Sequence, residues 1–153
     1  MSKQSAGILL YKFDNILQVF LVHPGGPFWK NKDAGSWSIP KGEFTDEEQA
    51  LDAAIREFEE ETGTKISGDF IELVPIKQKA GKIIYAWAVK GEIDASTIKC
   101  ETKIQMEWPP KTGKHISFPE VDKGEWFTVE AAKQKINPSQ AALINELIEK
   151  GIV

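Results

Sequence analysis

The sequence predicts one α/β domain in which a mixed β-sheet packs between helices. Apolar, β-branched runs typical of strands alternate with amphipathic helical segments, in the order strands, helix, strands, helix. The 153 residues are 41% hydrophobic and 27% charged, a balance typical of a globular domain. A chain of this length buries about two-thirds of its unfolded surface, so it needs neither disulfides nor a structural metal to fold.

Several strands are expected along the chain. Residues 5–11 and 17–23 are apolar runs joined by a polar turn, which predicts a hairpin. A loop rich in Gly and Pro follows. Further strands are expected at residues 35–39, 70–78, 83–89, 98–108 and 125–127, with a long irregular loop at residues 109–124.

The helices have recognisable ends. The first is expected to begin at Thr45, which with Glu48 matches a capping box, and to end at Gly63, the residue type that favours left-handed backbone. Residues 129–136 are helical in pattern, and Asn137 precedes a proline that suits the first turn of a last helix.

Composition excludes several classes of protein. Cys100 is the only cysteine, which rules out a disulfide scaffold and fits a reducing, cytoplasmic location. The apolar run at residues 8–11 is too short for a signal peptide, and no stretch reaches the length of a membrane span. The net charge of −4 argues against long nucleic acid as the main partner. Monomer and homodimer both stay open.

Charge is concentrated in one block. Residues 43–61 hold nine acids and a single base, Arg56, for a local charge of −8, so the rest of the chain carries +4. Such a block is often only a solvated face. Arg56 is the only arginine beside 18 lysines. Because a guanidinium offers a rigid two-pronged donor that lysine lacks, its position suggests a geometric role.

Three carboxylates in this block point to a metal. On a helix, Glu57, Glu60 and Glu61 are close neighbours, beside the expected core face. That core face comprises Leu51, Ala54, Ile55, Phe58 and Thr62. As solvated helix formers the glutamates would repel one another near the negative end of the helix dipole. Oxygen ligands without His or Cys favour Mg²⁺ or Mn²⁺, which commonly contact substrate phosphates.

The spacing of these residues resembles a known motif. The segment at residues 42–64 is similar to the Nudix box, G-x5-E-x7-R-E-U-x-E-E-x-G-U, in which U is bulky and apolar. It has Gly42, then Glu48 after five residues, and the run REFEEETGT at residues 56–64 after seven more. Only Thr64 departs from it. Residues 37–42 and 126–131 also resemble Nudix segments, so the likeness spans nearly the whole chain. It implies a single Nudix domain over residues 1–153, with the α/β/α sandwich and mixed central sheet of the MutT-like hydrolases.

The resemblance also implies an activity and its residues. Nudix hydrolases use Mg²⁺, with Mn²⁺ as a substitute, to cleave a nucleoside diphosphate linked to another moiety by attack of water at phosphorus. Nucleoside triphosphates, dinucleoside polyphosphates and nucleotide sugars are such substrates. By resemblance, Glu57, Glu60, Glu61 and the Gly42 carbonyl bind the metal, and Arg56 orients the glutamates. Glu48 is a secondary ligand or the capping residue, and we favour capping.

Further expectations concern residues outside the box. In the family the proton acceptor is a glutamate either within the box or in a late loop. Glu120 resembles the late-loop glutamates and is also a candidate metal ligand, although it fits an ordinary loop residue as well. Lys41 is a candidate for phosphate contact. Trp37, Tyr85, Trp87 and Phe28 are candidates for stacking on a nucleobase, although aromatic residues in strands more often belong to the core.

Both histidines, His23 and His115, are expected to be structural or exposed. Two alternative functions stay open. One is a Nudix-type module that binds a nucleotide without cleaving it, and the other is a pyrophosphohydrolase of capped RNA ends.

Overall fold

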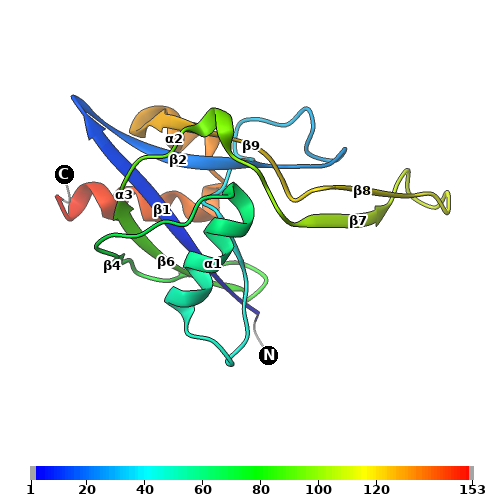
Figure 1. The fold of residues 1–153 in the computed structure, drawn as a ribbon, viewed down its shortest axis with the longest axis horizontal. Helices are drawn as coiled ribbons and strands as arrows, with labels where there is room; N and C mark the ends of the chain where they lie inside the picture. The colour runs from blue at the N-terminus through cyan, green and yellow to red at the C-terminus, as the bar shows by residue number, and fades with distance from the viewer. Residues whose placement is uncertain (1–2, 152–153) are drawn as a thin grey trace.

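A seven-stranded mixed sheet forms the centre of the fold in a computed structural model, which describes residues 3–151 (Figure 1). Its main path is β4 (Ile71–Glu72), β6 (Ile83–Lys90), β1 (Gln4–Asp14), β2 (Ile16–Pro24) and β9 (Val121–Thr128), with β5 (Ile76–Lys77) added beside β6 and β3 (Lys41–Glu43) beside β1. Strands β1 and β6 are parallel, and the other paired strands of this sheet are antiparallel. The predicted mixed sheet is confirmed.

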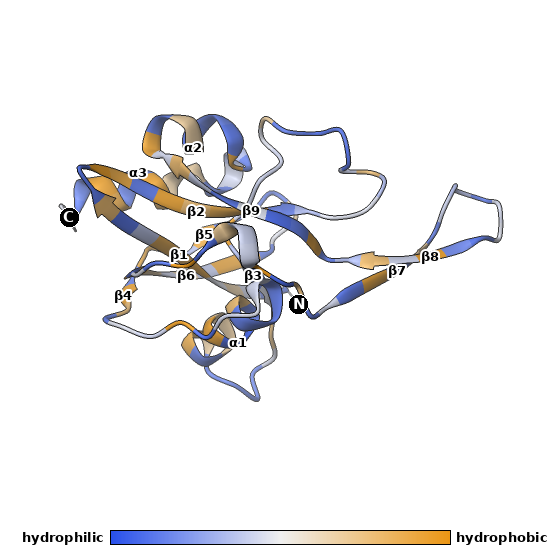
Figure 2. Cartoon of the chain, turned by 45° about the horizontal axis from the view of Figure 1, so that its top comes forward, coloured by the Kyte–Doolittle hydropathy of each residue, from blue (hydrophilic) through white to orange (hydrophobic). Residues whose placement is uncertain are grey.

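Helices cover both faces of the sheet. Helix α1 (Ala50–Thr62) lies on one face, and α2 (Val129–Lys135) and α3 (Ala141–Glu149) lie on the other (Figure 2). Successive residues of a strand point to opposite faces, so Ile8 and Leu10 pack with α1 while Leu9 and Tyr11 pack with α3. No helix within residues 3–151 has the length and apolar character needed to cross a membrane.

The C-terminal helices begin as the sequence indicates. Thr128 caps α2, since its hydroxyl accepts a hydrogen bond from the Ala131 N–H. Asn137 accepts from the Ser139 N–H at the start of the short 3₁₀ helix η2 (Pro138–Gln140), which leads into α3. Another 3₁₀ turn, η1 (Ala95–Thr97), follows β6.

Strand β1 brings the start of the predicted box beside the helix. Its C-terminal half pairs with β2, whereas its N-terminal residues pair with β3, with Ala6 opposite Gly42. Gly7 is needed there, because a Cβ on it would lie 2.7 Å from the Pro40 carbonyl oxygen and from the Lys41 side chain. This close pairing places Lys41 and Gly42 under α1.

The prediction of a long irregular loop at residues 109–124 is wrong. Strand β7 (Lys103–Glu107) pairs with β8 (His115–Pro119) in a separate hairpin that projects from the body of the molecule, and β9 already begins at Val121 (Figure 1). The strand expected at residues 98–108 therefore belongs to this hairpin and not to the central sheet. Met106 lies opposite Ile116 in the register.

Two other elements also differ from expectation. The strand predicted at residues 35–39 is reduced to isolated bridges, because Ser38 pairs with Val22 while Trp37 pairs with Ile136 on the other side. The run at residues 70–78 is split into β4 and β5, which pair with different parts of β6. Trp37 pairs with a residue far along the chain, so local pattern does not fix the first break, whereas β5 pairs with β6 across a short turn.

Candidate active site

Helix α1 begins at Ala50, and the predicted capping box is wrong. Thr45 lies in a turn in which its carbonyl accepts a hydrogen bond from the Glu48 N–H at 3.3 Å, and Gln49 precedes the helix without a side-chain cap. The Glu48 carboxylate instead binds the Arg56 guanidinium in a bidentate, charge-assisted pair. The other end is as predicted, since Gly63 has a φ of 78° and its N–H donates to the Glu59 carbonyl.

Two of the predicted carboxylates are buried. Glu57 and Glu61 are only 8% and 4% exposed, and they share the inner face of α1 with Ala54 and Phe58. Burial raises the pKa of Glu61 well above its usual range, with smaller contributions from nearby Glu120 and Glu57. Burial also raises the pKa of Glu57. Glu61 Oε2 has no hydrogen-bond partner, so a buried acceptor is left available to a ligand.

Gly42 provides the space that Glu57 occupies. A Cβ on Gly42 would lie 2.0 Å from the Glu57 carboxyl carbon and 2.1 and 2.3 Å from its two oxygens. Only a residue without a side chain permits this approach. The glycine of the box therefore has a steric role that spacing alone does not reveal.

Arg56 joins three glutamates. Its Nη2 and Nε donate to the two oxygens of Glu48 at 2.6 and 3.2 Å. Its Nη1 donates to Glu57 Oε1 at 3.0 Å and to Glu60 Oε2 at 3.1 Å. The hydrogen bond to Glu48 raises the pKa of the guanidinium further above its usual value. The geometric role suggested by the single arginine is thus present in the contacts.

Lys41 and Glu120 face the same space from other elements. Glu120 lies between β8 and β9, and its Oε2 accepts a hydrogen bond from the Thr102 hydroxyl at 2.8 Å. Lys41 opens β3, and burial followed by the charge of Lys82 lowers the pKa of its ammonium. Nearby Glu61 and Glu120 act in the opposite direction.

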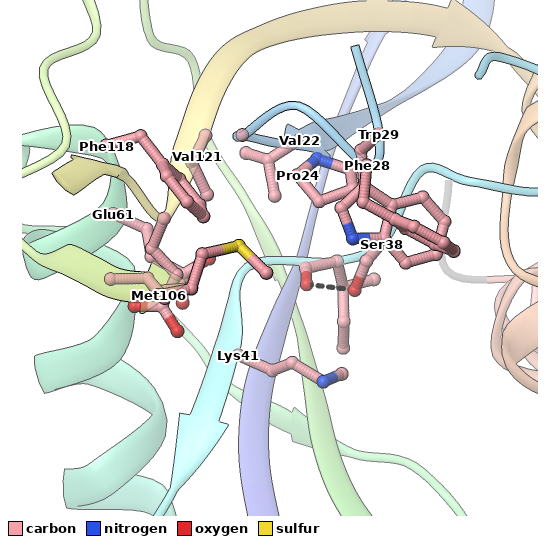
Figure 3. A pocket seen from close by; sticks show the side chains of 14 residues that line it. Val22, Pro24, Phe28, Trp29, Ser38, Lys41, Glu61, Met106, Phe118 and Val121 are labelled. Atoms are coloured by element: carbon pink, nitrogen blue, oxygen red, sulfur yellow. Dashed lines mark hydrogen bonds between the residues drawn. The ribbon is translucent and has the colours of Figure 1, made fainter. Parts of the chain in front are cut away.

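Two adjoining cavities share these two residues. One, of about 420 Å³, is largely polar and is lined by Lys41, Gly42, Glu43, Glu57, Glu60, Lys82, Thr102 and Glu120. The other, of about 430 Å³, is largely apolar (Figure 3) and is lined by Val22, Pro24, Gly25, Phe28, Trp29, Ser38, Ile39, Lys41, Glu61, Ile104, Met106, Phe118, Glu120 and Val121. A ligand with a charged part and an aromatic part fits such a pair of cavities.

The sequence matches the family model described as NUDIX domain over residues 1–147. The chain belongs to the Nudix family. An RNA pyrophosphohydrolase from Agrobacterium fabrum is 31% identical over 127 residues, which cover 73% of this chain and 69% of that protein. Membership of the family makes the chain a hydrolase that acts on phosphoanhydride bonds.

Solved structures support the same fold. The Nudix domain of Shewanella oneidensis NrtR, in complex with ADP ribose, matches 98% of this chain and 88% of its own with a TM-score of 0.68 at 16% identity. A binary complex of the Caenorhabditis elegans Ap4A hydrolase matches 97% of this chain and 98% of its own, with a TM-score of 0.66 at 18% identity. At these identities the likeness establishes the Nudix fold alone.

The aromatic residues expected to bind a base are only partly placed there. Trp37 is 2% exposed, packs edge-on against Phe127 and does not line either cavity, so its predicted role is wrong. Tyr85 also lines neither cavity and packs against Phe44. Trp87 is partly buried and packs against the core cluster beneath α1. Phe28, in contrast, lines the apolar cavity of the Nudix domain and is 52% exposed.

The residues that line the cavities include four, Trp29, Lys82, Met106 and Phe118, for which the sequence predicted no role in a site. Lys82 follows the turn between β5 and β6, and Trp29 adjoins Phe28. Met106 and Phe118 come from the β7–β8 hairpin. For Met106 and Phe118 the sequence did hold a signal, because apolar and polar residues alternate at 103–107 and 115–119, a pattern that predicts two strands.

Neither histidine lines the polar or the apolar cavity. His23 is buried, with Nδ1 2.9 Å from Asp122 Oδ1 and Nε2 2.6 Å from the Lys32 carbonyl oxygen. His115 is exposed on β8. Within residues 3–151, no three His, Cys, Asp or Glu side chains converge as a ready-made metal cluster.

Proposed function

We propose that this Nudix hydrolase is Mg²⁺-dependent and cleaves a nucleoside diphosphate linked to another moiety, by attack of water at phosphorus. One observation carries the proposal. The polar cavity beside the α1 carboxylates and the apolar cavity share Lys41 and Glu120. A substrate can therefore place its pyrophosphate in the polar cavity and the attached nucleoside in the apolar cavity.

The residues present fit a divalent metal. Glu61 carries an unpartnered buried oxygen, and Glu57 fills the space left by Gly42. Mg²⁺ is commonly held by one or two carboxylates, with water and substrate phosphates completing its shell, so a ready-made cluster is not required. We assign Glu57, Glu60, Glu61, Glu120 and the Gly42 carbonyl as its ligands. When bound, the metal supplies charge neutralisation and acidifies a water molecule.

The protein's own groups have separate tasks. We assign the Lys41 ammonium, which lines both cavities, to a phosphate oxygen of the substrate. Glu120, held by Thr102, is the candidate to accept the proton of the attacking water. Arg56 holds Glu57 and Glu60 in position.

The test is a panel of nucleoside diphosphate derivatives with Mg²⁺ or Mn²⁺ in heavy-oxygen water. The panel includes nucleoside triphosphates, dinucleoside polyphosphates, nucleotide sugars and a 5′-triphosphate RNA. We expect hydrolysis of at least one compound, with one heavy oxygen in a phosphate product. Turnover that persists unchanged with chelator would contradict the metal requirement. Binding without any turnover would favour the nucleotide-sensing alternative.

RNA ends are a second candidate substrate. The observation that favours them is the similarity to the Agrobacterium fabrum RNA pyrophosphohydrolase. A higher kcat/KM for 5′-triphosphate RNA than for the matching nucleoside triphosphate would support this candidate, and equal values would favour small nucleotides.

Mg²⁺ is expected to stabilise the protein. A ligand that binds only the native state at 100 times its Kd adds about 2.7 kcal/mol to the free energy of unfolding. For a domain of this size, that raises Tm by about 5 to 10 °C. Differential scanning fluorimetry with millimolar Mg²⁺ or EDTA measures the shift. An unchanged Tm would contradict the metal site.

Arg56→Lys is expected to reduce activity about 10- to 100-fold at limiting Mg²⁺, the usual effect of losing an outer-shell partner of a metal ligand. One ammonium cannot reproduce the bonds that Arg56 makes to Glu48, Glu57 and Glu60. Excess Mg²⁺ should partly restore the rate. Kinetics against metal concentration test this, with Glu92→Gln as a control that removes only the exposed ion pair to Lys12. Wild-type kinetics at every Mg²⁺ concentration would show that Arg56 only balances charge.

A further inference from the structure

The apolar cavity has two walls from separate parts of the chain (Figure 3). The loop after β2 supplies Phe28 and Trp29. The β7–β8 hairpin supplies Met106 and Phe118, which face them across the cavity (Figure 3). The open space of about 430 Å³ lies between aromatic and apolar groups on both sides.

Direct contacts hold the two walls together at one end. The Gly25 N–H donates to the Glu120 carbonyl at 3.0 Å. Gly26 has a φ of 96°, and a Cβ on it would lie 2.4 Å from the Phe118 ring. Its two requirements, left-handed backbone and close packing, are met by glycine alone. The loop and the hairpin are thereby fixed as one binding surface.

The loop wall is also held from behind. The Lys32 ammonium lies 3.7 Å from the centroid of the Phe28 ring, a cation–π contact. The Lys32 carbonyl oxygen is 2.6 Å from His23 Nε2, and His23 is buried beneath it. Phe28 meets Trp29 edge to face, with the centroids 4.9 Å apart. The exposed Phe28 ring is therefore positioned before any ligand arrives.

Few groups in this cavity could read the edge of a base. The Ser38 hydroxyl already donates to the Ile39 carbonyl at 2.7 Å and accepts from Gln140 Nε2 at 3.0 Å. Lys41, Glu61 and Glu120 are the charged lining residues, and the proposed function already assigns all three to the metal and the phosphates. Among the described lining residues, the Trp29 indole N–H is the remaining side-chain donor.

We propose that this cavity binds the nucleobase by stacking between Phe28 and Met106, without hydrogen-bond readout of the base edge, so that the enzyme accepts adenine and guanine alike. A site built to hydrogen-bond a ligand rejects the wrong one by about 10⁴- to 10⁵-fold, whereas an apolar pocket discriminates only about 10- to 200-fold. The proposal rests on the proposed function in one respect, that the phosphates lie at Lys41 and Glu120.

Matched pairs of variants isolate the stacking contribution. Met106→Ala is paired with Ile116→Ala, because Ile116 lies opposite Met106 in the hairpin and does not line the cavity. Phe28→Ala is paired with Phe13→Ala, because the two rings are similarly exposed, at 52% and 53%, and Phe13 lies outside the cavity near the β1–β2 turn. Calorimetry measures the Kd of ADP, GDP, CDP and UDP, with inorganic pyrophosphate as the probe without a base, in Mg²⁺ throughout.

We expect the Kd values of ADP and GDP to agree within about tenfold. Phe28→Ala should raise the nucleotide Kd about 5- to 160-fold, the usual range for loss of a base-stacking side chain, and Met106→Ala should raise it in the same sense. Both should leave pyrophosphate binding unchanged, and the two control variants should bind every ligand as the wild type does.

Three results would overturn the stacking site. They are a difference above about 100-fold between ADP and GDP, an equal loss of pyrophosphate and nucleotide binding in the cavity variants, and wild-type binding of ADP no tighter than that of pyrophosphate. A protein that gives the expected binding pattern but hydrolyses nothing in the substrate panel would refute the proposed function and leave the stacking site standing.

Discussion

Replacement of Glu61 by glutamine is expected to lower turnover of the best substrate by more than about 100-fold, beyond the 10- to 100-fold typical for loss of an outer-shell partner of a metal. Glu61 is 4% exposed and carries a buried oxygen without a partner. The amide keeps the shape of the side chain but removes the charge that a divalent cation requires. Glu57→Gln is expected to give a similar loss. Steady-state kinetics at saturating Mg²⁺ measure both.

The same variant should fold at least as stably as the wild type when metal is absent. Because burial raises the pKa of Glu61 in the fold, its native state holds more protons than the unfolded chain between the usual pKa and the raised one. Stability from this group therefore falls as pH rises through that window. With EDTA, wild-type Tm should decline more from pH 5 to pH 8 than that of Glu61→Gln.

A control on the same helix separates charge from position. Glu59 is exposed on α1, so Glu59→Gln removes an equal charge without touching either cavity. It is expected to keep both the activity and the pH dependence of the wild type. Full activity in Glu61→Gln, or an equal loss in Glu59→Gln, would contradict the assignment of Glu61.

The part of the site on α1 could be predicted because helix periodicity fixes it. Residues four apart lie side by side on a helix, and Arg56 indeed contacts Glu60. The contact between Arg56 and Glu48 could not be predicted in this way, because it crosses the turn before Ala50. The sequence pattern there fits a cap equally well, and only the path of the backbone decides between them.

The residues that line the apolar cavity could not be predicted from local sequence pattern, for a different reason. Trp37 and Phe28 are both aromatic residues in the segment between β2 and β3, yet Trp37 is buried in the core and Phe28 lines the cavity. Their places depend on Ile136 and on the β7–β8 hairpin, which are about 80 or more residues away. Pairing over such separations is set by the whole fold.

Gly42→Ala is expected to lower activity by more than about 100-fold and to destabilise the fold by about 1 to 3 kcal/mol, the usual cost of overpacking a dense interior. The added methyl group would lie 2.0 Å from the Glu57 carboxyl carbon, so that carboxylate must move away from β3. Arg56 holds Glu57 Oε1 at 3.0 Å, and the movement would disturb this bond as well.

A double-mutant cycle tests whether Glu57 is the cause. If the methyl group acts only by colliding with that carboxylate, Gly42→Ala should cost little stability in a Glu57→Ala background, and the two changes should be strongly non-additive. Gly91→Ala is the control, because its added Cβ meets only the ends of the Leu10 and Ile66 side chains, at 3.2 and 3.3 Å. Chemical denaturation of the four proteins and the control gives the coupling. Additive losses would mean that Gly42 is needed for the β1–β3 backbone and not for the placement of Glu57.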